Sequence, residues 1–346
     1  MNRFFLLFAF LAITTHSIFA QDSIKQKDPL QMTDAEKRAY YKPKFSATLL
    51  CRYEFNPRLD AHHFQIRHAR VGVNGDLHPM FSYHALADLA YGGKISIVCL
   101  LAHFKPVKGL TLTIGYDKLP FSTENLLSPY KYYFSDKSFL TQYVTGWSDA
   151  GATLTYQWDK VLPFRITAGV FNTHGFAAQM EWQKTLSYVT RGEFNLFRNF
   201  NLTLNYGYIA AQGDTMQSHN IGAGFTYDFY NLHWEAEYIC RKHYNKNYSP
   251  TQALQTFLFY NINIPNKYLK KVSLGARYDV ISSCEPLEGI DLGKSTLRQR
   301  LTTGITLTFI ESPFRGAIRL DYEKFFLSKG LQNNHDRFIV ELITHF

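Results

Sequence analysis

The sequence predicts an all-β fold, a membrane-spanning antiparallel β-barrel of about 16 strands with short periplasmic turns and longer external loops. Three observations carry this prediction. The segment 335–346 alternates apolar and polar residues and has an aromatic residue as its last member. Aromatic residues make up 16% of the 346-residue chain, although the mean hydropathy is only −0.22. Beyond residue 20, no run of about 18 apolar residues occurs that would cross a bilayer as a helix.

Residues 1–20 have the organisation of a secretory signal peptide. A positive start is followed by a short apolar run at 4–13, and Ala20 offers a small residue before a cut ahead of Gln21. The alternative is an uncleaved membrane anchor. We expect export from the cytoplasm, and we interpret the polar residues 21–43 as a periplasmic lead-in or a small plug.

The predicted barrel comprises residues 44–346 and consists of segments with a period of two. In the last of them, Phe338 and Val340 share one face, while Ile339 and Glu341 share the other. Such a period places the two sets on opposite faces of a strand. The same alternation occurs, in chain order, in segments 44–55, 110–117, 200–210, 222–229 and 297–309. Each predicted strand has roughly 9–13 residues, enough to cross a membrane at a tilt.

The connections between these strands alternate in length. Every second one is short and rich in turn-forming residues: 75–79, 105–109, 159–163, 198–199, 230–231, 265–267 and 311–313. Most of the others are longer: 119–149, 172–184, 242–251 and 282–296. The segment 91–93 departs from this pattern because it is short. An alternation of short turns and longer loops is typical of a membrane barrel, whereas a soluble β-sandwich has no reason to keep it in register.

One predicted strand, 62–76, breaks the alternation. Phe64 and Ile66 have one parity, whereas Ala69 and Val71 have the other. A β-bulge at Arg67-His68 would return both sets to the lipid face, because a bulge inserts one extra residue into a strand.

The four cysteines do not form the pattern of a disulfide scaffold in a chain of this length. Cys51, Cys99 and Cys240 fall on the predicted apolar faces of separate strands. We therefore expect them to be small hydrophobic residues that face lipid.

The formal net charge is +9, but Lys and Arg are spread along the strands and the chain is expected to be exported, so we predict no nucleic-acid partner. Arginines at predicted lumen positions could bind carboxylate or phosphate through their planar donor fork. Acidic residues share the same face, so ion pairs that only stiffen the wall are the alternative. The candidate lumen-lining residues are Arg52, Arg70, Arg165, Arg191, Arg277, Arg298, Arg300, Arg319 and Arg337.

The longest predicted loop, 119–149, is the third external loop. A barrel of this size leaves an aqueous channel unless something narrows it. We predict that this loop forms the constriction, with Lys118, Lys131, Lys137 and Tyr132 as its candidate residues, because rings of lysine select anions in pores. The alternative is an external cap with solvated lysines.

No catalytic, cofactor-binding or metal site is predicted. The sequence has no Gly-x-Ser-x-Gly elbow and no metal-ligand spacing. The pattern therefore indicates a protein that is not an enzyme and needs no cofactor.

Three segments resemble the phosphate-selective porin O and P family. Residues 68–77 resemble its strand-turn with the pattern R-A-R-(hydrophobic)-G-x-G-x-L, and residues 108–125 are similar to its K-G-L segment that leads to K-x-P-F-S-x-E. Residues 170–175 are similar to its F-N-G-x-G element, with Thr173 where glycine is usual. The stretch from Lys118 to Glu124 is the most specific part of the resemblance.

The resemblance implies a 16-stranded porin in the outer membrane of a Gram-negative bacterium, often a homotrimer, through which small hydrophilic solutes diffuse passively. A preference for anions or phosphate is the expectation that the family name suggests and that the acidic lumen residues leave open. The expected partners are outer-membrane lipid, small anions or other small solutes, and the barrel-assembly machinery, which would recognise the C-terminal strand. The alternatives are a non-conducting structural or adhesive barrel and, less in keeping with the pattern, a barrel enzyme or a soluble periplasmic β-protein.

Overall fold

The computed structural model describes Thr33, Lys37 and residues 41–91, 93–210, 217–244, 250–282, 297–327 and 335–346. The chain divides into two compact units, Met1–Tyr40 and Tyr41–Phe346, and the strands described below belong to the second unit. The predicted signal peptide and nearly all of the predicted lead-in lie outside the described residues. None of the helices in the described residues has the length and apolarity needed to cross a membrane.

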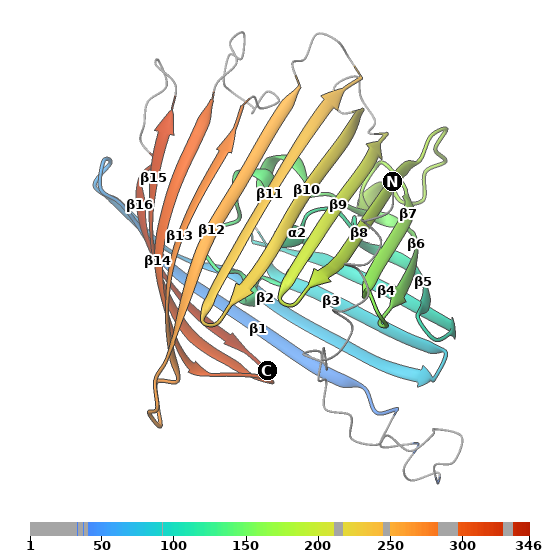
Figure 1. The fold of residues 1–346 in the computed structure, drawn as a ribbon, viewed down its shortest axis with the longest axis horizontal. Coiled ribbons are helices and arrows are strands. Elements are labelled where there is room, and N and C mark those ends of the chain that lie inside the picture. The colour runs from blue at the N-terminus through green and yellow to red at the C-terminus, as the bar shows by residue number, and fades with distance from the viewer. Residues whose placement is uncertain are drawn as a thin grey trace, which may run out of the picture. The chain divides into compact units, whose positions relative to one another are not determined.

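Sixteen strands of this unit close into one antiparallel barrel in which each strand pairs with its neighbours in the sequence (Figure 1). This confirms the predicted fold class. The strands are β1 Lys44–Asn56, β2 Ala61–His78, β3 Phe81–Tyr91, β4 Lys94–Val107, β5 Leu110–Lys118, β6 Ser148–Trp158, β7 Phe164–Phe171, β8 Ser187–Phe197, β9 Phe200–Ile209, β10 Ser218–Phe229, β11 Leu232–His243, β12 Thr251–Asn263, β13 Lys271–Ile281, β14 Arg298–Ile310, β15 Arg315–Leu327 and β16 Arg337–His345.

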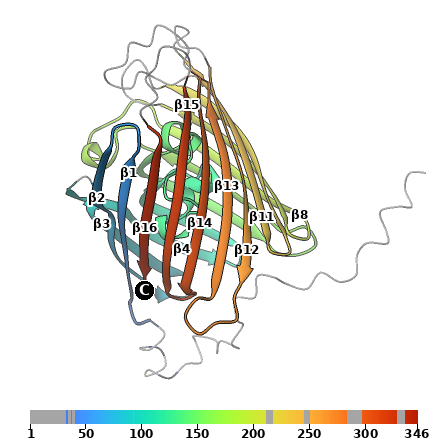
Figure 2. The same cartoon turned by 90° about the vertical axis from the view of Figure 1, so that its left-hand side faces the viewer.

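The first and last strands form the seam that closes the barrel. β1 pairs with β16 from Thr48 opposite His345 to Phe55 opposite Phe338, and Figure 2 shows β16 between β1 and β15. The backbones of Ala47 and Phe346 exchange two further hydrogen bonds, of 2.8 and 3.0 Å. The alternation predicted at 335–346 is therefore that of a strand paired on both sides, and the seam leaves no unpaired edge.

Side chains alternate between the two faces of the wall as the period of two predicts. In β14, Leu301 and Ile305 are 39% and 41% exposed on the outer face, whereas Arg300 and Thr302 are 1% and 0% exposed on the inner face. A strand can show apolar residues to lipid and polar residues to the lumen only in this way.

The predicted β-bulge in β2 is confirmed. Leu50 of β1 pairs with His68, but the next residue, Cys51, pairs with Ile66, so Arg67 is the extra residue. Because of this insertion, both Arg67 and His68 point inward: a guanidinium nitrogen of Arg67 lies 4.0 Å from Asp136 inside the barrel, and His68 is buried.

A second bulge, in β4, corrects the expectation for Cys99. Leu86 pairs with Cys99 and Ala87 pairs with Ile97, which leaves Val98 as an extra residue. Cys99 is 3% exposed, and its Sγ lies 3.5 Å from Nδ1 of His84. It therefore faces the lumen side and not lipid, because the bulge shifts the parity of the strand.

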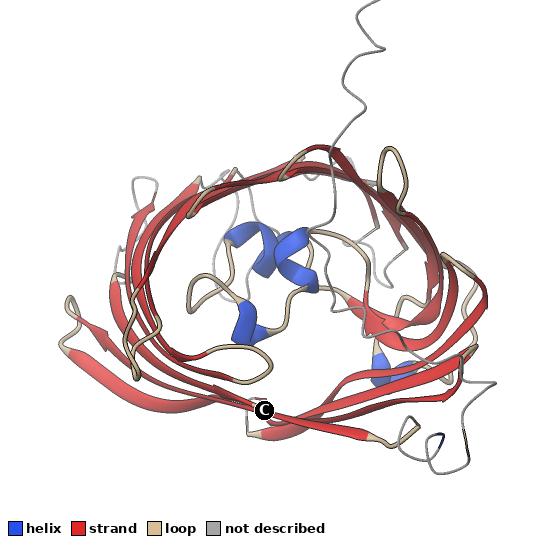
Figure 3. Ribbon diagram, turned by 60° about the horizontal axis from the view of Figure 1, so that its bottom comes forward, coloured by secondary structure: helices blue, strands red, loops and turns tan. Residues whose placement is uncertain are grey.

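The long connection after β5 turns into the barrel. It contains α2 (Thr123–Leu126), a 3₁₀ turn at Pro129–Lys131 and one turn of π-helix at Leu140–Val144, and Figure 3 shows helical turns within the ring of strands. A further 3₁₀ turn, Phe176–Ala178, follows β7. We call residues 119–147 the lumen segment.

Candidate functional site

The lumen segment starts and ends at one end of the barrel. The amide of Leu119 donates to the carbonyl oxygen of Trp147 over 3.1 Å, so the two ends of the segment are held together where β5 ends and β6 begins. We call this end, which carries the longer connections, the loop end, and the opposite end the turn end. The segment runs from this closed neck into the lumen and back.

An apolar cluster anchors the segment near its neck. Phe121, Leu140 and Val144 are 0% exposed, and the whole cluster is formed by Leu119, Phe121, Phe139, Leu140, Val144, Phe171, Val189, Ile209, Ile239, Ala253, Ile281 and Phe325. Gly207 makes room for Phe121, since a Cβ there would lie 3.2 Å from a ring carbon. Burying each large side chain stabilises the docked segment by roughly 1.5–3 kcal/mol, which makes the segment a folded element and not a loose loop.

Arginines of the barrel wall bind backbone carbonyl oxygens in the middle of the segment. Arg319 donates to the carbonyl oxygens of Tyr132 and Phe134, and Arg277 donates to that of Asp136 over 2.8 Å. In the same way, Arg300 donates to the carbonyl oxygen of Lys137, and Arg241 donates to the carbonyl oxygen of Val144. An irregular backbone in a barrel must find partners for its carbonyl groups, and a guanidinium group supplies several donors in one plane.

The same arginines pair with acidic residues of the wall. Arg319 lies 2.7 Å from Glu341, and Arg300 lies 2.9 Å from Asp279 and 3.0 Å from Glu323. All of these side chains are 0–1% exposed. Their guanidinium groups therefore point inward but contact carboxylates and the segment, and they do not face water.

Asp136 is the ionic centre of the segment. Its carboxylate lies 2.9 Å from Arg52 of β1, binds Arg337 of β16 and lies 4.0 Å from Arg67 of β2. Burial alone would raise the pKa of Asp136, but the guanidinium groups of Arg52 and Arg337 lower it below its ordinary value. One carboxylate thus links three neighbouring strands to the segment.

The four candidate constriction residues have different environments. The ammonium group of Lys118 donates to the carbonyl oxygens of Asn125 and Leu127, so it holds the fold of the segment. Tyr132 is 5% exposed and lies beneath Nζ of Lys137, which is 5.9 Å from its ring centre. Lys131 is exposed, with Nζ 5.6 Å from the ring centre of Tyr130.

Lys137 is the lysine whose charge interacts with arginines of the barrel wall. Within the described part of the chain, no carboxylate lies within 4.0 Å of its ammonium group. Burial lowers the pKa of Lys137, the carboxylate of Glu124 opposes this, and the charges of Arg70 and Arg67 reinforce it. Arg67 is 39% exposed, while Arg70 is bound to Asp88 over 3.0 Å.

The inner faces of β2–β7 differ from the rest of the wall. Their side chains are partly exposed and mostly uncharged, and threonine hydroxyls and imidazoles form a band in which Thr155 and Thr167 lie 3.0 Å apart and His103 and Thr113 lie 2.9 Å apart. The segment packs mainly against β8–β16 and β1, where most inner side chains are buried, and it also contacts Phe171 of β7 and Arg67 of β2. The more exposed inner side chains therefore lie mainly on β2–β7.

The remaining predicted arginines differ in exposure, as the two parts of the wall do. Arg191 is buried and donates to Asn205 and to Thr123 of the segment, and Arg298 lies 6.0 Å from the ring centre of Tyr143. Arg337 is 27% exposed. Arg165, at the turn end, is 50% exposed and lies 3.5 Å from Glu193.

Sequence reasoning missed Asp136 and Arg241, since their partners lie far away in the sequence and no local pattern marks them.

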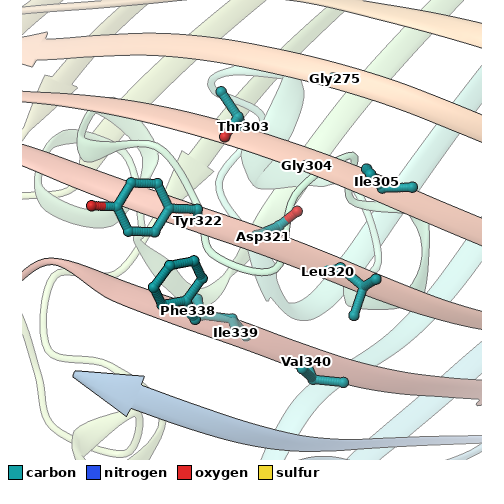
Figure 4. Close-up of a pocket in the computed structure, with 10 residues that line it drawn as sticks. All are labelled: Gly275, Thr303, Gly304, Ile305, Leu320, Asp321, Tyr322, Phe338, Ile339 and Val340. Carbon is teal, nitrogen blue, oxygen red and sulfur yellow. The ribbon is translucent and has the colours of Figure 1, made fainter. Parts of the chain in front are cut away.

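A hollow on the wall over β13–β16 is not part of this site. Tyr322 and Phe338 lie at one side of it, with ring centres 4.5 Å apart, and Figure 4 shows the side chains around the backbone of Gly304. Ile305, Leu320, Phe338 and Val340 at its rim belong to the outer, lipid-facing set, whereas Asp321 and Ile339 are buried on the inner face. The lining residues are Gly275, Thr303, Gly304, Ile305, Leu320, Asp321, Tyr322, Phe338, Ile339 and Val340.

Comparison with known proteins agrees with this geometry. The family model described as phosphate-selective porin O and P matches residues 53–245. No curated protein matches the sequence.

Solved structures of porins share the fold. The anion-selective porin from Comamonas acidovorans aligns with a TM-score of 0.60 at 10% identity, over 88% of this chain and 98% of that one. OmpF of Salmonella typhi, in complex with daunomycin, gives 0.63 at 14% identity, over 89% and 98%. OprB of Pseudomonas putida gives 0.64 at 11% identity, over 90% and 96%. At these identities the likeness concerns the fold alone.

Proposed function

The chain belongs to the phosphate-selective porin O and P family of outer-membrane porins, and from that premise we propose that its lumen passes small hydrophilic anions in preference to cations. The family and the fold support a channel rather than an enzyme. Solutes move down their gradient through water between the lumen segment and the inner faces of β2–β7.

The distribution of charge along this passage supports the proposal. Arg67, Lys131 and Lys137 present positive charge with no carboxylate in hydrogen-bonding contact among the described residues, whereas Asp88 is buried and bound to Arg70 and His68. Positive groups beside a narrow aqueous path attract anions and exclude cations. The single observation that carries the proposal is that Arg67 and Lys137 lie close enough for their charges to interact, while Asp136, the carboxylate nearest to Arg67, is shared with Arg52 and Arg337.

A tight phosphate site has less support. A buried phosphate is best held by several guanidinium forks. Arg277, Arg300 and Arg319 already bind carboxylates and backbone carbonyl oxygens. The proposal is therefore a general preference for small anions.

We propose export through cleavage after residue 20, recognition of β16 by the barrel-assembly machinery, and a homotrimer in the outer membrane whose lipid-facing wall carries the apolar side chains described above.

Single-channel recording in a planar bilayer under a KCl gradient tests the function. We expect stepwise conductance and a reversal potential on the chloride side. The double variant Arg67→Gln/Lys137→Gln should move the reversal potential toward zero. Lys160→Gln is the matched control, because Lys160 lies in a turn with Nζ 5.4 Å from the ring centre of Trp158, away from the passage.

The opposite outcomes separate the alternatives. A wild-type reversal potential on the potassium side, or one that the double variant leaves unchanged, contradicts the anion preference. A folded, inserted barrel that never conducts supports the non-conducting structural barrel, which the apolar packing of the lumen segment favours.

A further inference from the structure

The tip of the lumen segment is held by two aromatic stacks. The ring of Tyr130 lies on the imidazole of His345 at 3.7 Å between centres and 11° between planes. The ring of Tyr133 lies on the imidazole of His233 at 4.7 Å and the same 11°. The histidines come from β16 and β11, which are separated by β12–β15, so the tip is attached to two distant places on the wall.

Both imidazoles also have polar contacts with side chains of the wall. Nδ1 of His345 lies 2.8 Å from the hydroxyl of Thr48, across the seam. Nδ1 of His233 lies 2.7 Å from Asp228, and Nε2 lies 3.7 Å from Glu235. A ring that cannot rotate offers a preorganised platform, so stacking a tyrosine on it costs little further entropy.

Tyr133 has additional aromatic contacts that define its pocket. Its ring centre lies 4.8 Å from that of Phe257 and 5.0 Å from that of Phe259, in tilted and edge-on arrangements. Tyr130 packs against Leu50 and Ile343 as well. The two tyrosines therefore have complementary sites on the wall and do not merely touch it.

Lys131 lies between the two attached tyrosines. It is the last residue of the 3₁₀ turn Pro129–Lys131. The backbone amide of Lys131 donates to the carbonyl oxygen of Ser128 over 2.8 Å. Its side chain is exposed, whereas that of the following residue, Tyr132, is buried. The position of the Lys131 ammonium group thus depends on how firmly the residues on both sides of it are attached.

We propose that His233 and His345 are positioning residues that clasp the tip of the lumen segment by stacking on Tyr133 and Tyr130, and that they thereby fix Lys131 beside the passage. They act through the segment and do not contact the solute. The part of this inference that concerns selectivity rests on the proposed function, whereas the clasp itself is independent of conduction.

The test compares variants that remove the stacks with variants that keep them. His233→Ala/His345→Ala removes both platforms, and His233→Phe/His345→Phe keeps two flat rings without the imidazole nitrogens. Tyr130→Leu/Tyr133→Leu removes the stacks from the segment side and leaves the wall untouched, which keeps the test decisive if the alanine variant does not fold. Heat-modifiable gel migration identifies the folded variants.

Hydrogen exchange of residues 128–134 in detergent micelles is the readout that needs no conduction. Each stack contributes modestly, so we expect exchange about tenfold faster without both stacks and close to wild type in the phenylalanine variant. Single-channel records should show larger open-channel noise in the alanine and leucine variants. The reversal potentials of the alanine and leucine variants should shift from the wild-type value by as much as that of Lys131→Gln does.

The clasp hypothesis is wrong if residues 128–134 of the leucine variant exchange at the wild-type rate. It is also wrong if these residues exchange as fast in the phenylalanine variant as in the alanine variant. If the wild type does not conduct, the proposed function fails, and the exchange data alone then decide whether the clasp exists.

Discussion

Two regions of the barrel wall use the same alternation for different purposes. From β8 to β16 and in β1, the inner side chains are buried beneath the lumen segment and include Arg277, Arg300 and Arg319 with their acidic partners. From β2 to β7, many of the inner side chains are partly exposed, and they include threonines such as Thr113 and Thr155. We call these the covered wall and the open wall.

The comparison shows that the number of charged residues in the lumen does not give the number of charges that face solvent. Most guanidinium groups are on the covered wall, where they bind backbone carbonyl oxygens and carboxylates. Few are on the open wall, where Arg67 is 39% exposed and its charge acts on Lys137 of the segment. A buried ion pair holds structure, because breaking it leaves an unpaired charge, while an exposed cation acts on passing ions.

The largest expected effect comes from a charge on the covered wall. Arg319→Ala takes one of its two guanidinium partners from the buried Glu341, which keeps Arg52, and leaves two carbonyl oxygens of the segment without these donors. This should lower the free energy of unfolding by about 3–5 kcal/mol. The matched change on the open wall, Arg165→Ala, should cost about 1 kcal/mol or less, because Arg165 is half exposed. Urea unfolding followed by tryptophan fluorescence measures both, and equal losses would contradict the division into two walls.

The next effect comes from the apolar anchor. Leu140→Ala should destabilise the docked segment by about 2–5 kcal/mol, since Leu140 is fully buried and its removal leaves a cavity. We expect a rise in single-channel conductance as the segment leaves its place. Leu154→Ala is the control, because Leu154 is 49% exposed on the outer face, where lipid replaces the lost contacts. Unchanged conductance in the Leu140 variant would show that the segment is held without the anchor.

A deletion can remove the bulge and its charge together. Deleting Arg67 should restore regular pairing of β2 with β1 and leave His68 and Arg70 facing inward, so we expect a folded, heat-modifiable barrel. The ratio of anion to cation permeability should fall a few-fold, since one charge at 4 Å is worth about 1 kcal/mol in water. Arg67→Gln keeps the bulge and should give the same ratio. A variant that does not fold would show that the bulge is required by the barrel itself.

The smallest effect is a dependence on alkaline pH. The pKa of Lys137 lies below its ordinary value, chiefly because of burial, so this ammonium group loses its proton at lower pH than a free lysine does. Its contribution to anion preference should therefore decline as pH rises toward 10.5, while that of Arg67 persists. Reversal potentials measured between pH 7 and pH 10 should drift in the wild type and stay level in Lys137→Gln.

Sequence reasoning succeeded where the period of two is expressed by neighbouring residues. The strands and the bulge at Arg67 follow from it, because Phe64 and Ile66 disagree in parity with Ala69 and Val71. It failed at Cys99, since the run Ile97 to Leu101 is apolar at every position and hides the shift caused by Val98.

The candidate site was predictable in part. The length of the connection after β5 indicated a constriction, but its contacts could not be foreseen. Asp136 binds Arg337, which is 201 residues away, and such a pairing leaves no local trace. Lys118 has the residue type of a selectivity group and yet binds backbone, because only the folded segment shows which carbonyl oxygens surround it.

Asp136 also links docking of the segment to closure of the barrel. Its carboxylate contacts Arg52 on β1 and Arg337 on β16, the two strands whose pairing makes the seam. Closure of the seam brings these guanidinium groups near each other, where a shared carboxylate relieves their repulsion. Docking of the segment and pairing of the first strand with the last therefore favour each other, so the two are thermodynamically coupled through one side chain.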